Sequence, residues 1–138
     1  MAGAGSIFAR IVAGEIPCHR VFENEHVLAF LDIRPLAEGH TLVLPKRPVA
    51  NLEELTPDEA AELGRQLVGL ARRIVAATGT EAYNVLLNNG QAAGQEVPHV
   101  HFHIIPRRTG DGLGFRWRPQ QRSNEELAAL AERIQAIP

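Results

Sequence analysis

Short apolar segments, separated by glycine, proline and charged residues, make up the first third of the chain. Residues 7–12 form one such segment, and Gly14 and Pro17 follow it, which predicts one or two helical turns. Residues 27–33 are almost all apolar, so they predict a strand that is buried on both faces. Together these runs predict strands at 20–23, 27–33 and 40–45, with a turn at 34–39.

The apolar positions change to a helical spacing after Thr56. Thr56 can cap a helix, Pro57 suits the first helical position, and Glu59 would complete a capping box. Gly79 would end this helix. Its apolar face would comprise Leu63, Leu67, Leu70, Ile74 and Val75.

The second half of the chain returns to strand patterns. Strands are predicted at 82–87 and 98–105, and the glycine-containing loop 88–95 separates them. Ser123 and Glu126 can begin a last helix, whose apolar face would hold Leu127, Leu130 and Ile134. Five strands joined mostly by short turns, without a helix after each strand, predict an α+β fold with a five-stranded antiparallel sheet and two main helices.

Composition and charge narrow the class of protein. The 138 residues suffice for one domain, and 45% hydrophobic with 22% charged residues is typical of a globular protein. A net charge of −2 provides no field that would hold a nucleic acid. Cys18 is the single cysteine, which excludes an intramolecular disulfide and a cysteine-based zinc site. Since no signal peptide or membrane-spanning apolar run is evident, we expect a cytoplasmic protein with no membrane partner.

Three of the six histidines alternate with apolar residues in one segment. His99, His101 and His103 are separated by Val100 and Phe102. In a strand, alternate side chains point to the same face, so the three imidazoles would lie together. In a helix, His99 and His101 would point about 200° apart. The spacing is therefore meaningful only in a strand.

Three interpretations of this strand remain open. The histidines could lie on an inert, solvated face. They could bind zinc, but the first and third would lie about 13 Å apart along the strand, and Glu96 is the nearest acidic residue. They could also serve phosphate chemistry, because a neutral imidazole is a competent nucleophile near pH 7. The loop 89–95 could bring backbone amides to an anion, which favours phosphate chemistry.

The segment 99–105 resembles the HxHxHxx signature of the histidine triad (HIT) family. Segments 7–11, 30–33, 39–46 and 94–95 also resemble family segments, in family order, so the resemblance runs from about Ser6 to Arg108. The Pro106-Arg107 ending resembles the general bacterial type more than the phosphoramidase branch. The resemblance implies a HIT-like fold and a homodimer. It also implies a single domain over 1–138, with a core at about 6–108 and a tail and helix at 109–138.

The resemblance also implies an activity. The middle histidine, His101, would attack the α-phosphorus of a purine nucleotide, and water would then release the nucleoside monophosphate. His103 would contact the phosphate or the bridging atom, His99 would support the other two, and His40 matches an additional upstream histidine. The substrate would be an AMP or GMP phosphoramidate or a dinucleoside polyphosphate, cleaved without a metal or other cofactor. The alternatives are a non-catalytic purine-nucleotide binding module and a metal-binding protein.

Further residues match nucleotide-binding positions of the family. Asn88 and Gln95 would contact phosphate or the leaving group, and Asp32 would bind the ribose hydroxyls. A plain turn role for Asn88 and an Asx-type turn at Asp32 stay open as alternatives. The apolar slot for the base would comprise Ile7, Phe8, Ile11, Phe30 and Ile33, which without the resemblance would be assigned to the core.

The chain departs from the family pattern in two places. Glu96 stands where the best-known eukaryotic members have a hydroxyl residue that helps protonate the leaving group, and an ionised carboxylate accepts but cannot donate. Ser6 and Ala9 stand where some bacterial relatives have a zinc-binding cysteine pair, so no such zinc is expected. In a dimer, the tail 112–118, with Phe115, Arg116, Trp117 and Arg118, is expected near a substrate site. Packing of the tail on its own subunit stays open as the alternative.

Overall fold

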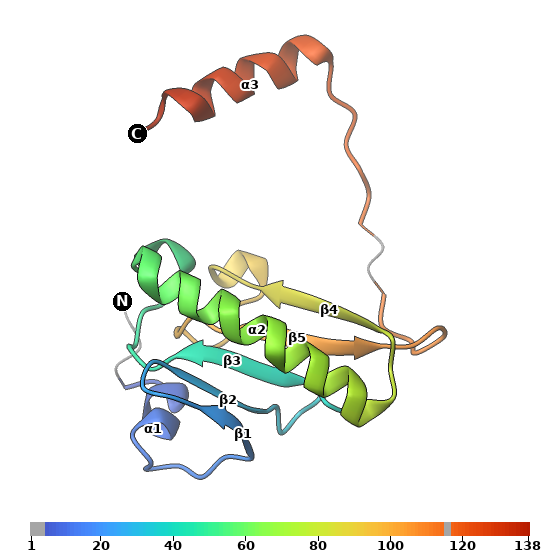
Figure 1. The fold of residues 1–138 in the computed structure, drawn as a ribbon. Coiled ribbons are helices and arrows are strands. Elements are labelled where there is room, and N and C mark those ends of the chain that lie inside the picture. Colours follow the sequence, from blue (N-terminus) through green and yellow to red (C-terminus); the bar gives the residue numbers. More distant parts are fainter. Residues whose placement is uncertain (1–4, 115–116) are drawn as a thin grey trace.

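The structure, a computed structural model, describes residues 5–114 and 117–138. Its centre is a five-stranded sheet in the order β1-β2-β3-β5-β4, in which all neighbours are antiparallel (Figure 1). The predicted α+β fold with an antiparallel sheet is therefore confirmed. No helix in the described ranges is both long and apolar enough to cross a membrane. The strands are β1 (Arg20–Glu23), β2 (Val27–Leu31), β3 (Thr41–Pro45), β4 (Ala82–Leu87) and β5 (Phe102–Arg107).

Helix α2 (Pro57–Thr78) lies across one face of the sheet (Figure 1). It begins at the predicted capping box, in which the Thr56 side chain accepts from the Glu59 amide and the Glu59 side chain accepts from the Thr56 amide. It ends at Gly79, whose φ of 69° is the left-handed conformation that glycine adopts without strain. The core under α2 comprises Val27, Ala29, Val43, Leu63, Leu70, Ile74 and Ile104.

Helix α1 (Ile7–Val12) packs on the opposite face of the sheet. Its Ser6 cap accepts a hydrogen bond from the Ala9 amide, and Phe8 packs edge-on against Phe30 with ring centroids 5.6 Å apart. Leu42 and Leu44 also belong to this cluster, whereas Val43 between them faces α2. The alternation of β2 and β3 therefore assigns the even-numbered positions of both strands to the α1 face.

Three strand boundaries differ from the sequence prediction. Strand β2 ends at Leu31 instead of 33, and β3 begins at Thr41 instead of 40. Strand β5 covers Phe102–Arg107 instead of 98–105, so His103 lies in it while His99 and His101 precede it. Phe102 is the first residue of β5 that pairs with both neighbours, because β4 ends at its partner Leu87 and the ladder with β3 stops at Val43. The Val100 amide instead donates to the Val49 carbonyl, at 2.7 Å.

Helix α3 (Asn124–Ala136) stands apart from the sheet (Figure 1). The predicted capping box of Ser123 and Glu126 is present. The expected apolar face is uncovered in the chain, because Leu127, Leu130 and Ile134 are 52%, 45% and 62% exposed.

Candidate active site

Four histidines and one aspartate gather on the α1 face of the sheet. His103 pairs with Leu42 of β3 and Leu86 of β4, and Leu42 packs on the α1 side, so His103 points to that side as well. Asp32 follows β2 and His40 precedes β3, both in the even register that faces α1. The predicted gathering of the histidines is thus achieved by β5 and by the ends of two other strands.

A glycine is required immediately before His40. Gly39 has a φ of 89°, and a Cβ added there would lie 2.6 Å from Cγ2 of Thr78 and 3.3 Å from Cγ of Pro106. Any side chain would therefore meet both a strained backbone and occupied space. Gly39 allows the chain to pass tightly under the end of α2 and enter β3 with His40 aimed into the site.

His101 has the geometry of a nucleophile. Its Nδ1 lies 2.7 Å from the His99 carbonyl oxygen, which only accepts, so Nδ1 carries the proton and donates. The Nε2 atom of the neutral ring then holds the free lone pair. The Phe8 ring packs perpendicular to the imidazole at 4.9 Å and limits its rotation, and the residue is 7% exposed. The nucleophile that the sequence predicts is therefore oriented by one hydrogen bond and one aromatic contact.

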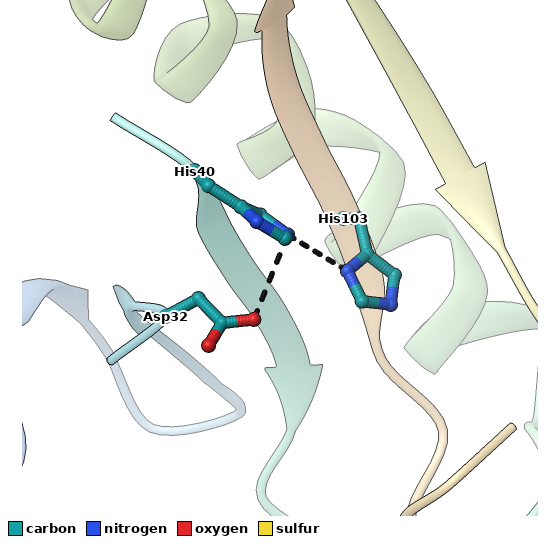
Figure 2. Close-up of side chains that lie close together, drawn as sticks. All are labelled: Asp32, His40 and His103. Atoms are coloured by element: carbon teal, nitrogen blue, oxygen red, sulfur yellow. Dashed lines mark hydrogen bonds and ion pairs between the residues drawn. The ribbon is translucent and has the colours of Figure 1, made fainter. Parts of the chain in front are cut away.

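His40 and His103 form a hydrogen-bonded pair whose proton positions follow from the backbone. The Leu36 amide donates to Nδ1 of His40 at 3.0 Å, so the proton of neutral His40 is on Nε2. This Nε2 lies 2.9 Å from Nδ1 of His103 and donates to it (Figure 2). His103 is thereby left with its proton on Nε2. The pair presents an N–H donor at His103 beside the free lone pair of His101, whose ring centroid is 4.9 Å away.

Asp32 combines a turn role with a place in the site. Its Oδ1 accepts from the Arg34 amide at 2.8 Å, which is the Asx-type turn considered from the sequence. Its Oδ2 lies 3.7 Å from Nε2 of His40 (Figure 2), and the side chain is 22% exposed. One carboxylate oxygen therefore shapes the turn, and the other faces the histidine cluster.

His99 is fully buried and cannot contact a bound ligand. Its Nε2 donates to the Pro45 carbonyl at 2.7 Å, and its ring lies 6.3 Å from that of Phe8. Its Nδ1 has no hydrogen-bond partner within residues 5–114 and 117–138. The geometry agrees with the supporting role expected from the resemblance, because the His99 backbone carbonyl is the group that orients His101.

Burial lowers the pKa of all four histidines. Loss of hydration is the largest cause for His40, His99, His101 and His103. The pKa of His103 falls to about 4, because His101 and His40 add repulsion that the attraction of Asp32 only partly offsets. All four rings are therefore neutral at pH 7, as a nucleophilic imidazole requires.

This shift predicts that acid destabilises the fold. An unfolded histidine has a pKa of about 6.5, whereas that of folded His103 is about 4. Between these values the unfolded chain binds more protons, so the free energy of unfolding falls as the pH is lowered. We expect His103 to contribute about 2 kcal/mol to this loss between pH 7.5 and 4.5. Urea unfolding of wild type and His103→Gln at both pH values measures it. Equal losses in the two proteins would contradict the assignment.

The loop before the histidines is held by its own Gln95. Its Oε1 accepts from the Gly90 amide at 2.8 Å, and its Nε2 donates to the Ala50 carbonyl at 2.7 Å. Gln95 thus fixes the loop to the segment after β3, a role that the sequence did not indicate. A cavity of about 630 Å³ opens beside it, lined by Gln91, Gly94, Gln95, Glu96 and Pro98.

Asn88 follows β4 on the same face of the sheet as the histidines. Leu87 pairs with Phe102, so Asn88 comes one position beyond, next to the start of β5. Asn88, Leu86, Leu87, Ala92, Ala93 and Trp117 line a cavity of about 640 Å³. The prediction for the tail includes Phe115 and Arg116, which lie outside the described residues.

The five residues expected in the apolar slot have different environments. Phe8 and Phe30 are buried and belong to the core of the α1 face, and Ile11 packs against the same cluster. Ile7 and Ile33 are 48% and 79% exposed. The two phenylalanines therefore have a packing role whether or not a base contacts them.

Three residues of the histidine and aspartate cluster could hold a metal ion. One ligand atom from each of Asp32, His40 and His103 lies within 4.8 Å of the others. However, Nε2 of His40 carries a proton and donates to His103. A metal there would have to displace that proton and break the hydrogen bond.

Backbone groups complete the site, and the sequence alone could not identify them. The Leu36 amide sets the proton position of His40, while the Pro45 and His99 carbonyls hold His99 and His101. Backbone amides and carbonyls are the same in every residue, so no sequence signal distinguishes these from the rest.

Comparison with known proteins gives a consistent result. A sequence model of the HIT domain family matches residues 13–110. The chain is 46% identical to the adenosine 5'-monophosphoramidase hnt1 of Schizosaccharomyces pombe over 129 residues, which are 93% of this chain and 94% of that protein. It is 42% identical to the adenylylsulfatase HINT3 of Arabidopsis thaliana over 131 residues, which are 95% of this chain and 65% of that protein.

Solved structures share the fold over nearly the whole chain. A HIT family protein from Bacillus anthracis has a TM-score of 0.92 and 40% identity, covering 98% of this chain and 97% of that one. A member of the HIT family from Bacillus subtilis has a TM-score of 0.91 and 41% identity, covering 96% of each chain.

Proposed function

The chain belongs to the HIT family, and on that premise we propose that it cleaves purine nucleotides at the α-phosphorus through a covalent nucleotidyl-histidine. The observation that carries the proposal is His101, whose Nδ1–H donates to the His99 carbonyl and whose Nε2 lone pair is free. The preferred substrate is an adenosine phosphoramidate, in line with the named activity of the fission yeast relative.

In the first step, Nε2 of His101 attacks phosphorus and the P–N bond of the phosphoramidate breaks. The amine leaves with the bonding pair and takes one proton from solvent. A nucleotidyl-imidazolium remains, and its Nδ1–H keeps the hydrogen bond to the His99 carbonyl, which stabilises the positive ring.

In the second step, water attacks the phosphorus and the bond to His101 breaks. The water oxygen forms the new P–O bond, its proton passes to solvent, and His101 returns to its neutral form. The Nε2–H of His103 donates to a phosphoryl oxygen in both steps. His40 is a positioning residue, because it fixes that proton on the outer nitrogen of His103.

The nucleoside lies on the β2 side of the histidines. Asp32 has one carboxylate oxygen that is not used in the turn, and a carboxylate accepts strongly from ribose hydroxyls. Ile7 and Ile33 expose apolar surface, which suits a purine ring. Both assignments rest on the resemblance together with this placement.

Chemical trapping of the intermediate tests the proposal. Wild type is mixed with an adenosine phosphoramidate labelled at phosphorus and is quenched within the first turnovers. We expect label on the protein, released by mild acid as phosphoramidate linkages are, and a peptide map that locates it at His101. Binding of the nucleotide without label or product would instead support a non-catalytic binding module.

We expect turnover to be independent of metal ions. The histidine donors supply the stabilisation that Mg²⁺ gives in most phosphoryl-transfer sites. Excess EDTA should therefore change the rate by less than about twofold, or under roughly 0.5 kcal/mol. A loss of tenfold or more that one metal restores would show that Asp32, His40 and His103 hold an ion during catalysis.

The sheet edge supports the proposed homodimer. Strand β4 is an edge strand, and Tyr83 and Val85 on it and Val68 on α2 are 43%, 47% and 54% exposed. Pairing of two β4 edges would satisfy their free backbone groups and cover this surface. We expect light scattering to show a dimer at micromolar concentration and a monomer for Val85→Lys. The exposed control Leu36→Lys should stay dimeric. A monomeric wild type would contradict the proposal.

A further inference from the structure

The loop that leads to the histidines carries one formal charge. From Leu86 to Pro98 every residue is uncharged except Glu96. Glu96 is exposed and lines the 630 Å³ cavity with Gln91, Gly94, Gln95 and Pro98. In the part of the chain that the structure describes, Glu96 makes no hydrogen bond or ion pair. A carboxylate therefore stands without a counter-ion at the wall of an open cavity.

The topology separates this cavity from the nucleoside side of the site. Strand β5, which carries His103, lies between β3 and β4 in the sheet. Asp32 and His40 approach from the β2 and β3 side, whereas the loop 88–98 joins β4 to β5 on the other side. The nucleoside and the leaving group are different substituents of the same phosphorus. If the nucleoside lies beside Asp32, the leaving group extends toward the loop 88–98, where the cavity at Glu96 is open.

We infer that Glu96 selects leaving groups that carry a positive charge, so the substrate is a nucleoside phosphoramidate of an amine with a second cationic group. This inference rests on the proposed function and deepens it by naming the leaving-group class. The carboxylate attracts a cation in the cavity and repels an anionic leaving group such as a nucleotide phosphate or sulfate. The neighbouring Gln91 and Gln95 supply no charge that would cancel this field.

Gln95 keeps the carboxylate in place. Its two hydrogen bonds to Gly90 and Ala50 fix the loop on the residue directly before Glu96. Gly94, which precedes Gln95, has a φ of 96°, and a Cβ on Gly94 would lie 3.7 Å from the Asn88 side chain. The loop is thus held directly before the charge, which supports selection by position as well as by sign.

The test uses three adenosine 5'-phosphoramidates that differ in the charge at the far end of the amine. The amines are 1,3-diaminopropane (cationic), 3-aminopropanol (neutral) and β-alanine (anionic). We expect wild type to have the highest kcat/KM for the cationic probe and the lowest for the anionic one. Glu96→Gln should lower kcat/KM for the cationic probe by about threefold to fivefold and raise it for the anionic probe by a similar factor. The neutral probe should change by less than about twofold.

Two controls isolate the local charge. Glu81→Gln removes an exposed carboxylate at the far end of β4 and should leave all three rates unchanged. Glu96→Lys should reverse the order of the probes. Raising the salt from 0.05 M to 0.5 M should reduce the wild-type preference, because it screens exposed charges.

The outcomes separate the two proposals. If the neutral probe is cleaved but the three rates are equal, or if Glu81→Gln has the same effect as Glu96→Gln, Glu96 does not select the leaving group. If no probe is cleaved and no label reaches His101, the proposed function is wrong and the inference falls with it.

Discussion

Replacing His101 by alanine is expected to lower kcat by about 10³-fold or more, which corresponds to roughly 4 kcal/mol or above in the barrier. The loss is large because the role is covalent and no neighbour can take it over. His99 is buried with its Nε2 bonded to Pro45, and Nδ1 of His103 accepts from His40. Neither ring offers a free lone pair at the position of Nε2 of His101.

Nucleotide affinity should change little in the same variant. The nucleoside would still contact Asp32 and the apolar surface, so the Kd for AMP by calorimetry should stay within about threefold, under 1 kcal/mol. His26→Ala is the matched control, because its side chain is 61% exposed and lies outside the cluster. Near-normal turnover of His101→Ala, or label trapped on another residue, would overturn the mechanism.

Replacing His103 by alanine should cost less, on the order of 10²-fold in kcat. The variant loses one N–H donor aimed at the phosphoryl oxygens, but it keeps the nucleophile. A lost transition-state contact lowers kcat and kcat/KM together, whereas a lost ground-state contact raises KM alone. Steady-state kinetics with the phosphoramidate of 3-aminopropanol distinguish a lost transition-state contact from a lost ground-state contact.

A second variant tests His40, which positions the N–H donor of His103, separately from His103 itself. His40→Ala keeps His103 but removes the hydrogen bond at 2.9 Å that fixes its proton on Nε2. We expect a loss of about tenfold in kcat, between wild type and His103→Ala. His103→Gln, which can place an amide N–H near the same point, should recover part of the loss. If His40→Ala raises KM and leaves kcat unchanged, His40 serves substrate binding instead.

Much of the fold follows from local signals in the sequence. Helix α2 is capped by Thr56 and by Gly79 as predicted, because capping hydrogen bonds and a left-handed glycine depend only on nearby residues. Helix α3 begins at its predicted capping box for the same reason. Short apolar runs bounded by turn residues predicted five strands. The alternate spacing of the three histidines predicted that their side chains gather, since alternate residues of an extended chain point to one side.

The ends of strands and the state of each imidazole depend on distant parts of the chain. Strand β5 begins at Phe102, where its pairing with Leu87 at the end of β4 and with Val43 of β3 stops, and both partners are distant in sequence. The sequence supplied the imidazoles, but the tertiary structure decided which nitrogen of each ring carries the proton. The Leu36 amide and the His99 carbonyl decide this for His40 and His101. Backbone groups are identical in every residue, so only the folded chain determines which of them meets which ring.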